Sequence, residues 1–186
     1  MDLTEQLLEN PIIASIKNEK GMSDVIKSDC KVVFVLFGSI ISIGSIVQKL
    51  KDSGKQVFVN VDLIDGLGSR EVVIDFIKLY TKADGILSSK SLLVKAAKDR
   101  GFIAIHRMFL IDSFAFYNVV KLLDQSHADF MELMPGCMPE TIADIKKMVT
   151  VPIIAGGLVC RKANVIGALK AGAIAISSTN EEVWEF

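Results

Sequence analysis

Short apolar segments alternate with amphipathic segments along almost the whole chain. Eight of the apolar segments are hydrophobic at nearly every position, which is typical of parallel strands that are covered by helices. We therefore predict eight strands, at about Ile12–Ser15, Val32–Leu36, Val57–Val61, Gly85–Leu87, Ile103–His106, Phe130–Met134, Ile153–Ala155 and Ala173–Ser177.

The segments between these strands carry helical periodicity and capping residues. Ser39 and Asp112 are suitable N-caps, and Pro139 is suited to the first turn of a helix. Residues 17–31 leave room for only one short helix. The other helices are predicted at about 39–51, 70–80, 91–99, 112–123, 139–149 and 161–170.

This repeated strand–helix pattern indicates an α/β fold with right-handed crossovers. Eight strands favour a compact (β/α)8 TIM-type barrel, and an open flavodoxin-like parallel sheet is the alternative. The chain has 186 residues, fewer than the roughly 200 at the lower end for such barrels, so its helices and loops must be short. No linker or low-complexity tract divides it, and we expect a single barrel domain over 1–186.

Composition and charge limit the functional classes. The chain is 51% hydrophobic and 23% charged, as expected of a folded globular protein, and its net charge of −1 gives no support to a dedicated nucleic-acid binder. The run Val32–Phe37 is too short to span a membrane, and residues 1–20 have no apolar core of a secretion signal. Cys30, Cys137 and Cys160 suggest free thiols in a cytoplasmic protein, without a metal site.

The two final strands end in residues suited to holding a phosphate. Gly156 and Gly157 let the backbone approach an anion and turn N–H groups toward it. Ser177, Ser178 and Thr179 add hydroxyl groups at the end of the last strand and directly after it. Because the loops after strands 7 and 8 form the usual phosphate site of such barrels, we predict a phosphate site from these five residues.

Charged residues lie at the ends of other strands, where the mouth of a barrel would be. Arg107 is a good partner for an anion, although a salt bridge to Glu132 is the alternative. Glu132 lies inside an apolar strand and needs a partner, either Arg107, a ligand hydroxyl, or both. Gly136 follows Pro135 and lets the backbone approach the pocket.

Two further residues could contact the polyol part of a ligand. Asp62 directly follows a strand and is predicted to accept hydrogen bonds from ligand hydroxyls, or else to cap the turn at Asp65 and Gly66. Lys17 could reach a phosphate or a ligand hydroxyl, or remain a solvated loop lysine. His106 alternates in direction with Arg107 and is expected to be a packed, hydrogen-bonded histidine.

Catalytic motifs are missing from this sequence. It has no GxSxG, no Walker motif and no lysine clearly inside a strand for a Schiff base. The pocket is therefore better equipped to bind a small polyol phosphate than to transform one. The alternative is a small barrel isomerase, aldolase or lyase, with Asp62 or Glu132 as general base and Arg107 stabilising charge.

Seven segments taken together resemble the glycerol-3-phosphate responsive antiterminator family. They are Asn10–Lys17, Val57–Gly66, Asp84–Lys90, His106–Asp112, Glu132–Gly136, Ile154–Leu158 and Ser177–Asn180, the last followed by Trp184. The resemblance implies a compact barrel that binds glycerol 3-phosphate as effector, needs no cofactor, and acts on leader mRNA to prevent premature termination. It implies a regulator and not an enzyme.

Carried over by position, the resemblance assigns the phosphate to Gly156, Gly157, Ser177 and Ser178. RNA contact would come from basic helix faces, for which the candidates are Lys95, Lys98, Arg100, Lys146, Lys147, Arg161 and Lys162. Phe114 and Phe116 suggest a homodimer surface, and core packing explains them equally well.

One position departs from the family. Members often carry a basic residue just after the Ser/Thr/Asn cap, whereas this chain has Glu181 and Glu182. Two carboxylates there oppose a phosphate bound at the same place. Either they point outward, or the affinity for phosphate is reduced.

Overall fold

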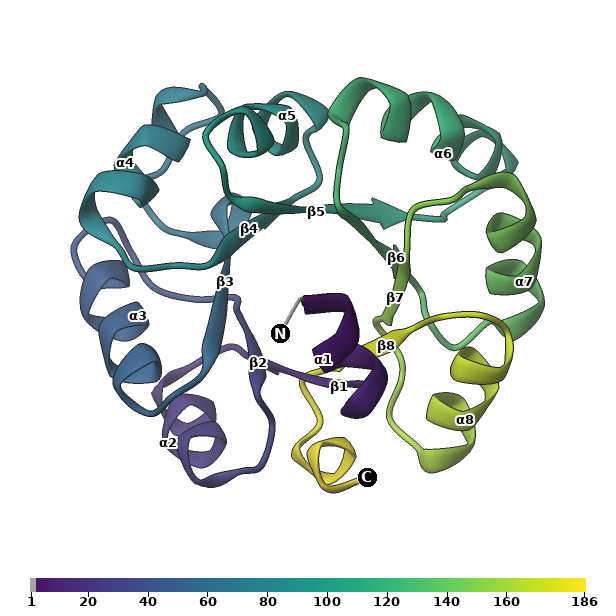
Figure 1. The fold of residues 1–186 in the computed structure, drawn as a ribbon, viewed down its shortest axis with the longest axis horizontal. Helices are drawn as coiled ribbons and strands as arrows, with labels where there is room; N and C mark the ends of the chain where they lie inside the picture. The colour runs from purple at the N-terminus through teal and green to yellow at the C-terminus, as the bar shows by residue number, and fades with distance from the viewer. Residues whose placement is uncertain (1–2) are drawn as a thin grey trace.

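The eight apolar segments form a closed barrel of parallel strands (Figure 1). Strand β1 pairs with both β2 and β8, which leaves no free edge. The computed structural model describes residues 3–186, and its strands are β1 (Ile12–Ile16), β2 (Val32–Val35), β3 (Gln56–Asn60), β4 (Gly85–Ser88), β5 (Ile103–Phe109), β6 (Phe130–Met134), β7 (Ile153–Gly156) and β8 (Ala175–Ser178). The TIM-type barrel is confirmed, and the open flavodoxin-like sheet is excluded.

Seven helices follow the first seven strands and surround the barrel (Figure 1). Each has between 9 and 14 residues, which explains how a complete barrel fits into this short chain. They are α2 (Glu19–Lys27), α3 (Ile43–Asp52), α4 (Val72–Tyr80), α5 (Ser91–Asp99), α6 (Ser113–Ser126), α7 (Pro139–Met148) and α8 (Lys162–Lys170). Two short 3₁₀ helices, η1 (Val61–Leu63) and η2 (Glu181–Glu185), follow β3 and β8.

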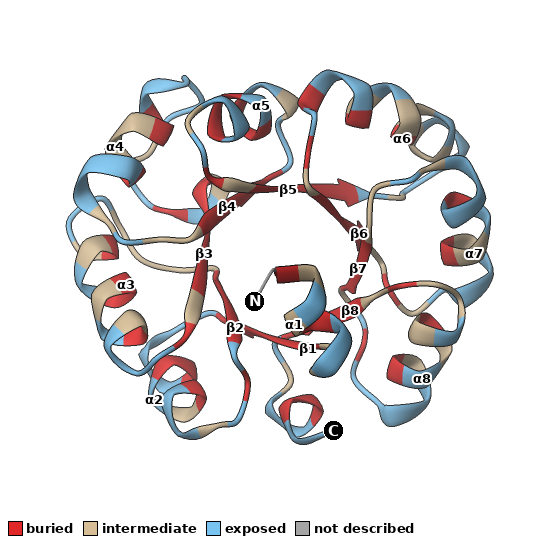
Figure 2. Ribbon diagram, in the orientation of Figure 1, coloured by how far each residue is buried: buried red, intermediate tan, exposed pale blue. Residues whose placement is uncertain are grey.

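An additional helix, α1 (Leu3–Glu9), lies across one end of the barrel (Figures 1 and 2). It directly precedes β1, so it closes the end at which the strands begin. Leu3 and Leu7 are buried among the side chains that fill the barrel interior. The sequence pattern did not predict this helix, because seven residues give too short a periodic window.

Two apolar layers hold the fold together. Alternate side chains of the strands point inward and fill the barrel, including Phe34 and Phe58, whose rings meet edge to face at 5.8 Å. The remaining strand side chains point outward and pack against the helices. Figure 2 accordingly shows the strands as buried and the outer helix faces as exposed. No helix among residues 3–186 is long and apolar enough to cross a bilayer.

Most predicted boundaries are confirmed within about three residues, and the start of helix α3 is the clear exception. Helix α3 begins at Ile43 and not at Ser39, because the Ser39 hydroxyl accepts hydrogen bonds from the N–H groups of Ile41 and Ser42 and forms a separate turn. Strand β8 begins at Ala175, two residues later than predicted. The Asp112 cap is confirmed, since its carboxylate accepts a hydrogen bond from Ala115 N at 2.8 Å.

The two phenylalanines near the start of α6 have different surroundings. Phe116 is partly buried and packs against the main core. Phe114 is 79% exposed. Core packing therefore explains Phe116 but not Phe114.

Candidate functional site

A buried polar network lies where strands β5, β6 and β8 end. The Glu132 carboxylate accepts hydrogen bonds from Arg107 Nε at 2.5 Å and from Ser177 Oγ at 2.5 Å. All three side chains are at least nine-tenths buried. They point inward because they continue the alternation of the apolar residues that fill the barrel below them. The network thus replaces the apolar filling with charge at the carboxyl end of the barrel.

Gly156 makes room for this network. A Cβ atom at that position would lie 2.5 Å from Ser177 Oγ and 2.7 Å from Glu132 Oε1, closer than real contacts allow. Glycine is therefore required by the packing of the Glu132 carboxylate. This role differs from direct phosphate contact, and Gly156 does not line the cavity that adjoins the network.

Arg107 is oriented by Glu132 and retains hydrogen-bonding capacity. Among the described residues, only its Nε–H donates a hydrogen bond to a protein partner. The two Nη atoms have no such partner, and neither of them is fully buried. The guanidinium group therefore retains N–H donors without a protein partner, and Arg107 lines the cavity that adjoins the network. A cation that is held in place by a buried carboxylate is well suited to bind an anion with little loss of side-chain entropy.

A cavity of about 140 Å³ adjoins the network at the carboxyl end of the barrel. One part of its wall is polar and another part is apolar. Its lining consists of Ser15, Leu36, Arg107, Glu132, Met134, Gly157, Leu158, Val159, Cys160, Ser177, Ser178 and Thr179. It thus brings together Arg107, Glu132, Gly157, Ser177, Ser178 and Thr179 of the predicted site, but not Lys17, Asp62, Gly136 or Gly156. The other lining residues were not predicted.

The loop after β7 adopts an unusual backbone at the edge of the cavity. Gly157 has φ 71°, and Leu158, with φ 57°, shares this left-handed region, which is rare for leucine. Gly136 N donates to the carbonyl oxygens of Gly156 at 2.5 Å and Gly157 at 3.0 Å, which fixes this loop from the side of β6. Strain held in place by neighbouring contacts is characteristic of ligand-binding loops.

The hydroxyl of Ser178 holds two loops together. It donates to the Val159 carbonyl oxygen at 2.8 Å and accepts from Asn180 N at 3.2 Å. Trp184 Nε1 donates to the Ser178 carbonyl oxygen at 2.8 Å, so the segment after β8 is tied back onto the strand. Thr179 is exposed, and its hydroxyl has no hydrogen-bond partner among residues 3–186.

Asp62 and Lys17 lie outside the cavity lining. The Asp62 carboxylate accepts hydrogen bonds from Ser88 Oγ at 2.8 Å, Ser89 N at 2.6 Å and Ser89 Oγ at 2.9 Å. It therefore anchors the loop after β4, a role that differs both from polyol binding and from the predicted alternative of capping the turn at Asp65. The Lys17 side chain is exposed.

His106 is a packed histidine, as the strand alternation predicted. Its Nδ1 lies 3.0 Å from Ser126 Oγ, and the residue is 1% exposed. Burial lowers its pKa below the usual 6.5.

The cysteines are free thiols, as predicted, and they differ in exposure. Cys30 is buried, Cys137 is partly buried and Cys160 is exposed. Burial raises the pKa of the Cys30 thiol. Within residues 3–186, no group of three or more His, Cys, Asp or Glu side chains is placed to hold a metal ion.

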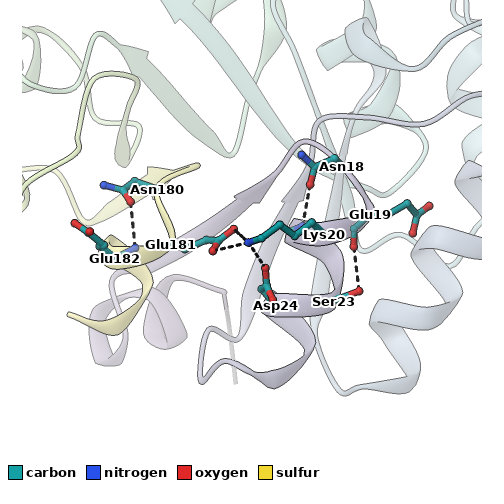
Figure 3. Close-up of polar contacts among 9 residues, drawn as sticks. Asn18, Glu19, Lys20, Ser23, Asp24, Asn180, Glu181 and Glu182 are labelled. Carbon is teal, nitrogen blue, oxygen red and sulfur yellow. Dashed lines mark hydrogen bonds and ion pairs between the residues drawn. The ribbon is translucent and has the colours of Figure 1, made fainter.

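Glu181 is paired with a cation that the sequence reasoning missed. Lys20 Nζ lies 2.8 Å from Glu181 Oε1 and 3.0 Å from Oε2 (Figure 3). The two residues are 161 positions apart, so no local pattern could have revealed the pair. The sequence left two alternatives for these acidic residues: they point outward, or the affinity for phosphate is reduced. The pairing with Lys20 favours the first alternative for Glu181.

The basic residues suggested for RNA contact lie on well-separated helices. Helix α5 is on a different part of the ring from α7 and α8 (Figure 1). Several are paired with carboxylates: Lys95 with Asp99, Lys98 with Asp129, Arg100 with Asp75, and Lys147 with Asp144. The remaining three, Lys146, Arg161 and Lys162, lie on α7 and at the start of α8, which pack against each other.

Known proteins share both the sequence and the fold of this chain. A family model described as glycerol-3-phosphate responsive antiterminator matches residues 12–184. The uncharacterized protein YgcP of Escherichia coli (strain K12) is 44% identical over 184 residues, which are 99% of this chain and 96% of that protein.

Two solved structures from other bacteria are also similar. The glycerol uptake operon antiterminator regulatory protein of Listeria monocytogenes has a TM-score of 0.91 at 31% identity, with 95% of each chain covered. A glycerol uptake operon antiterminator-related protein from Thermotoga maritima has a TM-score of 0.83 at 31% identity, with 94% of this chain and 98% of that chain covered. The chain therefore belongs to the glycerol-3-phosphate responsive antiterminator family.

Proposed function

We propose that this protein is a regulator that binds glycerol 3-phosphate in the cavity at the carboxyl end of the barrel and, when liganded, acts by antitermination on the leader mRNA of glycerol-metabolism genes. The observation that carries the proposal is Arg107. Glu132 holds its guanidinium group through Nε, and both Nη groups stay without a hydrogen-bond partner among the described residues. A fixed cation with donors to spare suits a phosphate ester.

The rest of the cavity suits the same ligand. Gly157 and Leu158 form a left-handed turn beside Arg107, and Thr179 contributes an uncommitted hydroxyl after β8. Leu36 and Met134 supply an apolar wall for a short carbon chain. The loops after β7 and β8 carry the phosphate site in many barrels of this fold.

The geometry gives less support to an enzyme. Among the described residues, the cavity lining includes no lysine and no histidine. Both oxygens of Glu132 already accept hydrogen bonds, and Asp62 is held by the loop after β4. Neither carboxylate is therefore poised to remove a proton from a bound polyol phosphate.

The RNA part of the proposal rests on family membership. Where RNA would bind, the structure favours α7 and the start of α8, since Lys146, Arg161 and Lys162 have no carboxylate partner within residues 3–186. Arg161 directly follows Cys160, which lines the cavity, so a ligand lies close to this surface. A response requires that the liganded state bind RNA more tightly than the free state.

The test is a mobility-shift titration of the cognate leader RNA at low salt, where phosphate contacts are strongest. Glycerol 3-phosphate should tighten RNA binding, and glycerol should leave it unchanged. An Arg161→Ala/Lys162→Ala variant should weaken RNA binding without changing the affinity for glycerol 3-phosphate. Lys95→Ala, which removes a lysine paired with Asp99 on α5, serves as the matched control. RNA binding that ignores glycerol 3-phosphate would contradict the proposal.

A further inference from the structure

Hydrogen bonds made by Asn180 and Glu182 hold the backbone on both sides of Glu181, so the direction of the Glu181 carboxylate depends on its side-chain contacts. The Asn180 side chain accepts a hydrogen bond from Glu182 N at 3.1 Å and donates to the Cys160 carbonyl oxygen at 3.1 Å. Asn180 N donates to Ser178 Oγ at 3.2 Å. These contacts fix the backbone around Glu181, which follows the cavity-lining residue Thr179 by two positions in the sequence. Glu181 therefore belongs to the segment that continues from the cavity lining, although its own side chain is not part of that lining.

Lys20 on α2 pairs with the Glu181 carboxylate. Its ammonium group contacts both oxygens of Glu181, at 2.8 Å and 3.0 Å, and Asp24 Oδ2 at 2.7 Å (Figure 3). Asp24 lies one helical turn after Lys20 and draws the ammonium group toward α2. These hydrogen bonds raise the pKa of Lys20 and lower that of Asp24.

We propose that Lys20 is a positioning residue for the anion site: by pairing with Glu181, it holds this carboxylate on the α2 side of the loop after β8 and compensates its charge, so that the loop can accept a phosphate ester. The inference rests on the proposed function, because it concerns the affinity of the same cavity. It explains how the chain tolerates an acidic residue directly after its phosphate-binding loop.

The geometry argues against direct contact between Lys20 and a ligand. An ammonium group has three N–H donors, and three carboxylate oxygens already surround it. Lys20 is also absent from the cavity lining. Its effect on affinity must therefore pass through Glu181, and this separates a positioning role from a binding role.

The test is a set of calorimetric titrations with glycerol 3-phosphate. Lys20→Met should weaken binding by about threefold to tenfold at low ionic strength, since it removes the cation shared by Asp24 and Glu181 and makes the local net charge one unit more negative near a doubly charged phosphate. Lys20→Arg, which preserves the pair, should retain the wild-type affinity. Glu181→Gln in the Lys20→Met background should restore it. Lys95→Met removes a lysine in the same i, i+4 arrangement on α5 and should have no effect.

The salt dependence of binding and the thermal stability of the Lys20→Met variant distinguish a positioning role of Lys20 from a role in folding. The loss in Lys20→Met should nearly vanish at about 1 M salt, where the screening length falls to about 3 Å. The Lys20 side chain is 71% exposed, so the Tm of the Lys20→Met variant should stay close to that of the wild-type protein.

Three outcomes are decisive. An unchanged affinity in Lys20→Met, with wild-type binding intact, would overturn the inference alone. A loss that Glu181→Gln fails to restore would also overturn it, because Lys20 would then act on the ligand directly. Absence of binding by the wild-type protein would instead refute the proposed function.

Discussion

Replacing Arg107 by methionine should expose the energetic role of the buried network. The exposed fractions of the Arg107 and Glu132 side chains are 8% and 1%, so water compensates little for the loss of the partner. Removing one member of a buried ion pair costs about 3–5 kcal/mol. For a chain of this length that corresponds to a fall in Tm of about 6–20 °C. Within residues 3–186, only the Ser177 hydroxyl would remain to donate to Glu132.

The double variant Arg107→Met/Glu132→Gln should recover most of this stability. It leaves no buried charge, and its amide oxygen can still accept the hydrogen bond from Ser177. Both variants should lose affinity for glycerol 3-phosphate, because both lack the guanidinium group. Comparing the single variant with the double variant therefore separates the effect on stability from the effect on ligand binding.

Urea unfolding followed by the fluorescence of Trp184, the single tryptophan of the chain, measures these differences. Lys147→Met is the matched control: it breaks an exposed pair with Asp144 and should cost less than about 1 kcal/mol. A loss in Arg107→Met no larger than in this control would refute the reasoning. So would a double variant that is as unstable as the single one.

Three further predictions concern single residues. Gly156→Ala should destabilise the fold by about 1–3 kcal/mol in urea melts and abolish ligand binding, because its Cβ would collide with Ser177 Oγ. Gly68→Ala, in open space, should change the stability by less than about 0.5 kcal/mol. Leu158→Gly should raise the free energy of unfolding by up to about 1 kcal/mol, since glycine accepts the left-handed backbone and the leucine is 70% exposed; a lower Tm would count against this. Because burial lowers the pKa of His106, the unfolded chain takes up its proton at a higher pH than the folded chain as the pH falls below 6.5. The free energy of unfolding should then fall by up to about 1.4 kcal/mol per pH unit, and His106→Asn should lack this slope.

The barrel could be predicted from the sequence because the signals for its strands and helices lie within short stretches of the chain. Strands buried on both faces are continuous apolar runs such as Val32–Val35, and capping residues such as Asp112 mark the helix starts. The pairing of Arg107 with Glu132 was one of the predicted alternatives, since a charge inside an apolar strand requires a partner.

What the sequence could not supply depends on contacts between distant segments. Whether Ser178 gives its hydrogen to a ligand or to Val159 is decided by the approach of two loops. Asp62 could equally face a cavity or anchor a neighbouring loop, and three donors from Ser88 and Ser89 at the end of β4 decide in favour of the anchor. The pairing of Lys20 with Glu181 joins opposite ends of the chain through barrel closure.

Isothermal titration of glycerol 3-phosphate into the purified protein tests the central claim most directly, with inorganic phosphate and glycerol as control ligands. The cavity at the carboxyl end of the barrel predicts that glycerol 3-phosphate binds well above both controls, and that Gly157→Val, which forces a β-branched residue into φ 71°, abolishes the heat of binding. No binding, or binding no tighter than that of phosphate alone, would contradict the account.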